Sequence, residues 1–201
     1  MKLFITFTLL FCISALFSQS DYESEIISYQ NEMNKFYSDT AISPLLKEDL
    51  ANFKSLDFFP INDKYRIKAK FIKKFNPITV TLKTSTDRAP KYKVFGELHF
   101  ELEGKQIKIN VYQSDKISEN EEYRDHLFLP FTDLTSDELS YGGGRYIDLK
   151  IPEGDLIIID FNKSYNPYCA YNHKYSCVIP PAENFIDFKI KAGVMKYKEK
   201  H

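Results

Sequence analysis

The spacing of apolar side chains divides the chain into a helical beginning and a longer β-rich remainder. Over residues 21–37 the apolar positions recur every third or fourth residue, which predicts an amphipathic helix. These positions are Tyr22, Ile26, Tyr29, Met33 and Phe36. A second, short helix is predicted after Ser43 and Pro44, because an N-cap residue followed by a first-turn proline is typical of a helix start.

From about residue 65 onward the apolar positions instead alternate with polar ones, as in half-buried strands. Strands are predicted over residues 65–71, 78–82, 98–102, 107–111, 127–131, 145–149, 156–161 and 185–191. A tight turn at Gly104 and Lys105 would join the third and fourth of them. Sequential strands without intervening helices predict a mainly β fold: an antiparallel barrel or sandwich with two N-terminal helices.

The first twenty residues have the pattern of a secretory signal peptide. Lys2 precedes an unbroken apolar run over residues 3–12, and small residues follow. The run is too short for a stable anchor, so we expect no transmembrane anchor after signal cleavage. We therefore predict an exported protein, periplasmic or secreted, with a signal peptide at residues 1–20, a helical segment at 21–55 and one antiparallel β domain at 56–198.

Charge and local motifs exclude several function classes. The 27 basic and 28 acidic residues nearly cancel, and the lysines are spread along the predicted strands, so nothing indicates a nucleic-acid partner. The sequence has no GxSxG, P-loop, HExxH or GxGxxG motif, so no enzyme class and no cofactor are indicated.

Two cysteines remain once the signal peptide is removed. In an exported protein, Cys169 and Cys177 are most simply paired as a disulfide, which the chain-entropy model values at about 2.6 kcal/mol. His173 lies midway between them, a spacing that would suit zinc on a helix. Because Asn166 and Pro167 indicate an irregular segment, the disulfide is favoured and no metal is predicted.

Polar residues gather near the predicted strand ends. The run YGGGR, residues 141–145, either presents backbone N–H groups to an anion beside Arg145 or forms a tight turn in which Arg145 pairs with a structural carboxylate. Asp160 ends the run LIII, which is expected to be buried, and is either a general acid or base or a brace for the next loop. Asp133 and Asp148 leave the same choice open.

Three functions remain as hypotheses. The leading one is a small-ligand or envelope-associated binding module for a small anionic or sugar-like ligand, because polar residues and glycines gather near the strand ends without a recognisable catalytic motif. Tyrosines at every third position over residues 165–171 either stack on flat rings of such a ligand or simply cover the loop with apolar area. Its candidate ligand-binding residues are Asp133, Tyr141, Arg145, Tyr146, Asp160, Asn162, Asn166 and Asn184. The second is a hydrolase- or lyase-type enzyme with Asp160 as acid or base, Arg145 holding an anionic substrate and Tyr165 as proton donor. The third is a purely structural domain.

Several motifs together resemble a known family. The runs FLPFTDLTSDELSYGGGRYIDL, DFNKSYNPYCAYNHKYSCVIPPAEN and IKAGV are similar to a bacterial family of unassigned function, the domain of unknown function sixteen eighty-four. The resemblance extends from about Phe58 to Val194 and implies no particular activity. Two positions depart from the family pattern, namely Val178, where proline is usual, and Val194, where glutamate is usual.

Overall fold

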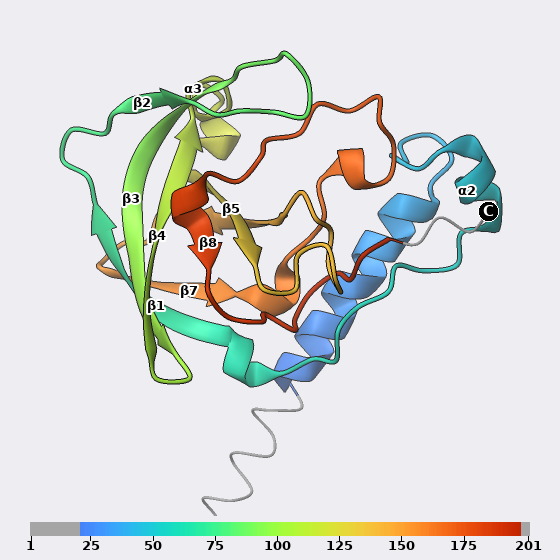
Figure 1. Cartoon of the computed structure of the whole chain (residues 1–201), viewed down its shortest axis with the longest axis horizontal. Coiled ribbons are helices and arrows are strands. Elements are labelled where there is room, and N and C mark those ends of the chain that lie inside the picture. The colour runs from blue at the N-terminus through green and yellow to red at the C-terminus, as the bar shows by residue number, and fades with distance from the viewer. Residues whose placement is uncertain (1–20, 198–201) are drawn as a thin grey trace, which may run out of the picture.

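One curled β-sheet with helices beside it makes up the structure (Figure 1). The computed structural model describes residues 21–197, so the predicted signal peptide lies outside the described residues. The helices are the N-terminal helix over residues 21–38, α2 (Lys47–Asn52) and α3 (Asp115–Ser118). The strands are β1 (Arg66–Lys73), β2 (Thr79–Thr81), β3 (Lys91–Leu102), β4 (Lys105–Ser114), β5 (His126–Asp133), β6 (Arg145–Lys150), β7 (Leu156–Asp160) and β8 (Phe185–Ile186).

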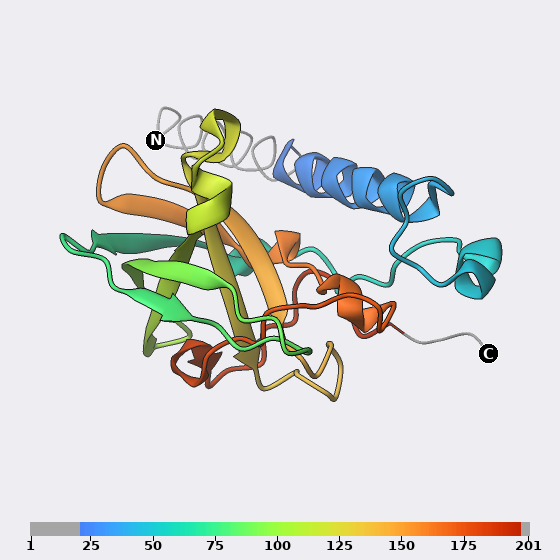
Figure 2. The same ribbon diagram turned by 90° about the horizontal axis from the view of Figure 1, so that it is seen from above.

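The strand order is β6-β5-β4-β3-β1-β7, with β2 added beside β3 and β8 beside β5. All pairings are antiparallel except that of β5 with β8. The sheet curls until its outer strands β6 and β7 come into contact, which gives a partly open barrel. The N-terminal helix lies beside this barrel, on the side away from β2 and the β3–β4 hairpin (Figures 1 and 2). The predicted mainly antiparallel β fold with N-terminal helices is confirmed.

Apolar and polar side chains alternate along the strands, and the apolar ones form the core. In β1, Ile67, Ala69 and Phe71 are buried, whereas Lys68 and Lys70 on the other face are exposed. Each fully buried large apolar side chain contributes about 1.5–3 kcal/mol. The run LIII in β7 is not buried throughout as predicted, because Leu156 and Ile158 on its outer face are nearly half exposed.

One turn and one helix start differ from prediction by a few residues. The β3–β4 hairpin turns at Glu103 and Gly104, both with positive φ, one residue earlier than expected; this is the two-residue turn whose twist matches that of paired strands. The second helix begins at Lys47 and not directly after Ser43. The Ser43 hydroxyl instead donates to the carbonyl of Tyr37 at 2.6 Å and accepts from the N–H of Leu45.

The strand predicted over residues 185–191 is also shorter than expected. Only Phe185 and Ile186 pair with β5; beyond them the chain turns away, and the N–H of Ile190 donates to the side chain of Asp133. The segment is therefore tied to the sheet by a side chain and not by a continued ladder.

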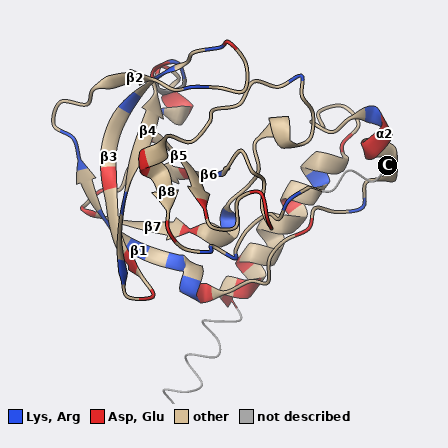
Figure 3. Ribbon diagram, in the orientation of Figure 1, with Lys and Arg blue, Asp and Glu red and all other residues tan. Residues whose placement is uncertain are grey.

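Charged residues are interspersed over the fold. Figure 3 shows lysine and arginine mixed with aspartate and glutamate along the described part of the chain. None of the helices in residues 21–197 is long and apolar enough to cross a membrane.

Candidate functional site

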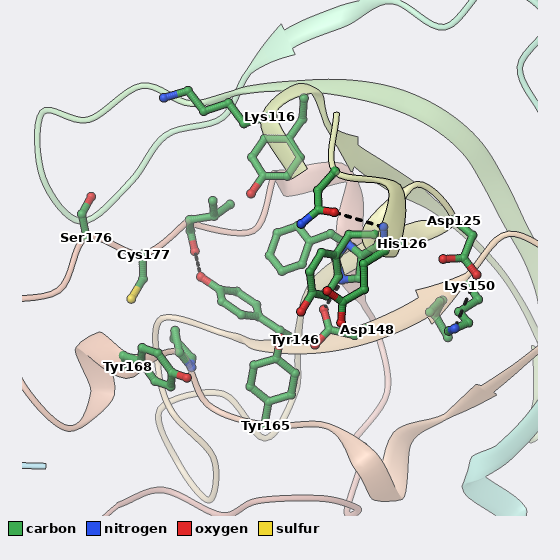
Figure 4. A pocket seen from close by; sticks show the side chains of 18 of the residues that line it. Lys116, Asp125, His126, Tyr146, Asp148, Lys150, Tyr165, Tyr168, Ser176 and Cys177 are labelled. Atoms are coloured by element: carbon green, nitrogen blue, oxygen red, sulfur yellow. Dashed lines mark hydrogen bonds and ion pairs between the residues drawn. The ribbon is translucent and has the colours of Figure 1, made fainter. Parts of the chain in front are cut away.

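A cavity with a volume of about 970 Å³ opens between β5, β6 and the loops that follow β7 and α3 (Figure 4). Aromatic residues are prominent in its lining, together with a few polar groups. The lining residues that matter below are Tyr92, Phe128, Tyr146, Tyr165 and Tyr168, with His126, Asp148, Lys150 and Cys177.

Strand alternation decides which predicted residues face this cavity. Successive side chains of a strand point to opposite faces of the sheet. In β6, Arg145 and Ile147 point into the barrel interior, while Tyr146 and Asp148 line the cavity. Arg145 and Tyr146 are adjacent in the sequence, yet they belong to different environments.

The aromatic wall is a chain of rings in mutual contact. The Phe128 and Tyr146 rings meet edge to face with centroids 4.7 Å apart, and the Tyr146 and Tyr165 rings do so at 5.8 Å. Tyr92 extends the wall, with its centroid 5.6 Å from that of Phe128. The Tyr146 hydroxyl donates to the carbonyl of Val178, which fixes the ring.

A polar group lies within this wall. One carboxylate oxygen of Asp148 accepts a hydrogen bond from the Tyr165 hydroxyl at 2.7 Å, and the other lies 2.8 Å from Nε2 of His126. Half of the Asp148 side chain remains exposed. Burial raises the pKa of Tyr165 well above its ordinary value, and the charge of Asp148 adds to this shift. The Tyr165 hydroxyl therefore keeps its proton and donates a hydrogen bond to the Asp148 carboxylate.

Backbone pairing places Tyr165 at the cavity. Its N–H and C=O both bond to the backbone of Tyr146, at 3.0 and 2.9 Å, so that one residue of the loop pairs with the free side of β6. The ring is held next to Tyr146 by the main chain and next to Asp148 by its hydroxyl.

Asp160 and Tyr165 both line a second, smaller cavity of about 380 Å³ between the N-terminal helix and β6–β7, which also includes Asp148. Asp160 accepts from the hydroxyl of Tyr22, at 3.0 and 3.1 Å, and from the N–H of Asn162 at 3.0 Å. It thus caps the turn after β7 and holds the N-terminal helix. Arg145 lines neither cavity.

Arg145 is one of the most buried side chains, with 1% of it exposed. Its guanidinium donates to the Asp133 carboxylate at 2.8 Å, to the carbonyl of Ile190 at 2.8 Å and to that of Ala192. Asp133 also accepts from the N–H of Thr135 at 2.7 Å. The pair joins the ends of β5 and β6 to the C-terminal segment, as in the structural interpretation of YGGGR.

The side-chain amides of two candidate asparagines bond to backbone N–H and C=O groups that have no strand partner. Asn184 accepts from the N–H of Asn110 and donates to its C=O, both at 2.9 Å, and also donates to the C=O of Pro130 at 2.7 Å. Pro130 has no N–H of its own, so the Asn184 amide bridges β4 and β5 where they cannot pair directly. Asn162 binds both backbone groups of Asn62 in the same way, at 3.1 and 2.9 Å.

The remaining candidates lie around the segment 165–178. The Asn166 amide donates to the carbonyl of Met195 at 2.9 Å, and the Tyr141 hydroxyl lies 3.7 Å from the Cys169 sulfur. Cys169 and Cys177 are free thiols in the structure, so the predicted disulfide is not formed in it. The N–H of Cys169 donates to the Cys177 sulfur at 3.1 Å, and the hydrogen bond between the two sulfurs is the main cause that lowers the pKa of Cys169 to about 6.

His126 was not among the residues predicted from the sequence. The position of His126 follows from the register between β5 and β6. Phe128 lies opposite Asp148, so His126, two residues before Phe128, is the diagonal neighbour of Asp148 on the same face. Both strands were predicted, but alternation within each strand does not give the register between them. Among the described residues, no group of three His, Cys, Asp or Glu side chains is placed to hold a metal ion.

Comparisons with known proteins agree with this fold. The solution NMR structure of an uncharacterized protein from Haloarcula marismortui superimposes with a TM-score of 0.69 at 32% identity, over 92% of this chain and 98% of that one. No functionally curated protein matches the chain. The family model described as "Protein of unknown function (DUF1684)" matches residues 51–195. The chain therefore belongs to the DUF1684 family, the one that its motifs resemble.

Proposed function

We propose that this protein is a binding module that takes a small ligand with a flat apolar face into the cavity between β5, β6 and the 165–178 loop. The observation that carries the proposal is the wall of contacting rings beside a half-exposed carboxylate. Small-molecule sites in proteins are concave and largely apolar, with a few placed polar groups, and this cavity has both properties.

The composition of the site favours binding over the hydrolase- or lyase-type alternative. Of the three residues in that hypothesis, Asp160 braces the N-terminal helix, Arg145 is buried in an ion pair, and the hydroxyl proton of Tyr165 is already engaged in a hydrogen bond to Asp148. At the cavity there remains the Asp148 carboxylate, a hydrogen-bond acceptor surrounded by aromatic side chains. Such a surface can select a ligand by its shape and by its hydrogen-bond donors.

A neutral fluorescent probe tests the proposal directly. Because the chain has no tryptophan, the emission of N-phenyl-1-naphthylamine reports its own burial without overlap. We expect saturable binding, weakened several-fold by Tyr168→Ala, since a contacting ring is worth about 1 kcal/mol. Phe75→Ala removes a ring that is 96% exposed and outside the cavity lining, and is expected to change nothing. Equal effects of both variants, or no saturation, would contradict the proposal.

We further propose that the protein acts after export and that the two thiols close as a disulfide there. Support comes from the signal-like first twenty residues and from the N–H···S contact that holds Cys177 beside Cys169. Mild oxidation should remove two hydrogens from the mass of the protein and stabilise it by about 2–3 kcal/mol in urea unfolding. Cys177→Ser should abolish both effects. A protein that stays reduced under glutathione disulfide would contradict the disulfide.

A further inference from the structure

The charge of the Asp148 carboxylate is not balanced by a lysine or arginine. Within the described residues, its only ion-pair partner is His126, and its other hydrogen bond comes from the neutral hydroxyl of Tyr165. Nδ1 of His126 is buried and has no hydrogen-bond partner there. The half-exposed carboxylate therefore has no lysine or arginine to neutralise it. An anionic group thus lies in the wall of the cavity.

The aromatic rings that line the cavity together with Asp148 are steeply inclined to one another. The planes of Phe128 and Tyr146 are inclined at 74°, and those of Tyr146 and Tyr165 at 89°. Successive perpendicular rings form a corner in which faces and edges alternate. Since the face of an aromatic ring carries partial negative charge, such a corner next to a carboxylate attracts a cation.

The basic residues of the same cavity are engaged elsewhere or turned away. Lys150 is paired with Asp125 at 3.5 Å, and Arg88 donates to the backbone and hydroxyl oxygens of Ser176 at 2.8 and 3.1 Å. Figure 4 shows the Lys116 amine pointing away from Asp148. The positive charges at the rim therefore do not cancel the negative charge at the ring corner.

We propose that the ligand is an organic cation whose ammonium group binds in the corner formed by Phe128, Tyr146 and Tyr165, next to Asp148. This inference rests on the proposed binding function and names the chemical class of its ligand. Carboxylate oxygens with unused acceptor positions suit a primary or a hydroxyl-bearing quaternary ammonium, and the ring faces supply the remaining contact.

A matched pair of probes tests the charge without any mutation. Choline and 3,3-dimethylbutan-1-ol have the same shape, but only choline is charged. In NMR titrations of the full chain, choline is expected to bind about tenfold or more tightly than the neutral alcohol. Methyl glucoside and benzenesulfonate serve as sugar and anion probes. Equal affinity for choline and the alcohol, or tighter binding of glucoside or sulfonate, would overturn the proposal.

Charge-neutralising variants locate the effect. Asp148→Asn should remove most of the preference for choline, whereas Asp187→Asn makes the same change of net charge at an exposed position outside the cavity and should preserve it. Loss of the preference in both variants would point to overall charge and contradict the site. If N-phenyl-1-naphthylamine binds but choline shows no preference, only the cation inference fails; if neither binds, the proposed function fails with it.

Discussion

Replacing Arg145 with alanine is expected to destabilise the protein by about 3–5 kcal/mol, because it leaves the Asp133 carboxylate buried without its partner. The loss is larger than that of an ordinary ion pair, since the guanidinium also satisfies the carbonyls of Ile190 and Ala192. A change of this size is comparable to much of the stability of a typical domain. Urea unfolding monitored by circular dichroism measures it, and the midpoint should fall steeply or the variant should fail to fold.

The matched control is Arg124→Ala. Arg124 forms an exposed pair with Glu121 at 2.9 Å, and exposed pairs contribute about 0–1 kcal/mol. An Arg145→Ala protein that unfolds at the wild-type midpoint but no longer binds any cavity probe would reverse the interpretation and return Arg145 to the ligand site.

Gly144→Ala is expected to cost roughly 3 kcal/mol, for two separable reasons. Gly144 has a φ of +87°, where a side chain costs about 1–2 kcal/mol. A Cβ there would lie 2.7 Å from the carbonyl oxygen of Phe131 and 2.5 Å from the Pro180 ring, which adds a packing penalty of about 1–3 kcal/mol. Gly144, the last glycine of YGGGR, is therefore required because the chain packs closely on β5 at this position.

Two other glycines separate these contributions. Gly104→Ala changes a residue with φ of +77° and open space around it, so only the backbone cost of about 1–2 kcal/mol should appear in urea unfolding. A Cβ on Gly154 meets nothing within 4 Å, and Gly154 has no positive φ, so Gly154→Ala should be close to neutral. If Gly144→Ala costs no more than Gly104→Ala, the predicted contacts with Phe131 and Pro180 are not significant.

Local sequence patterns predicted the elements well, because alternation within a strand is set by neighbouring residues. The buried face of β1 follows directly from Ile67, Ala69 and Phe71. The same rule, applied to the residues of β6, puts Arg145 and Asp148 on opposite faces of the sheet. The predicted ligand site instead included both Arg145 and Tyr146, which are adjacent in β6 and therefore also face opposite sides.

What local patterns could not supply is the pairing between distant segments. The contact of His126 with Asp148 depends on the β5–β6 register, and the replacement of the missing Pro130 N–H by Asn184 depends on a loop 54 residues later in the chain. The extent of β8 was overestimated for the same reason, because its end is fixed by the N–H of Ile190 bonding to Asp133.

The bridge between Tyr165 and Tyr146 also has a consequence for self-association. An unpaired outer strand is a template on which a strand of another copy can add, leading to aggregation. On β6 the loop backbone already occupies that position at Tyr146, with both of its hydrogen bonds made. A second copy could add there only after the loop had been removed, so the same residue that lines the cavity also protects the open side of the barrel.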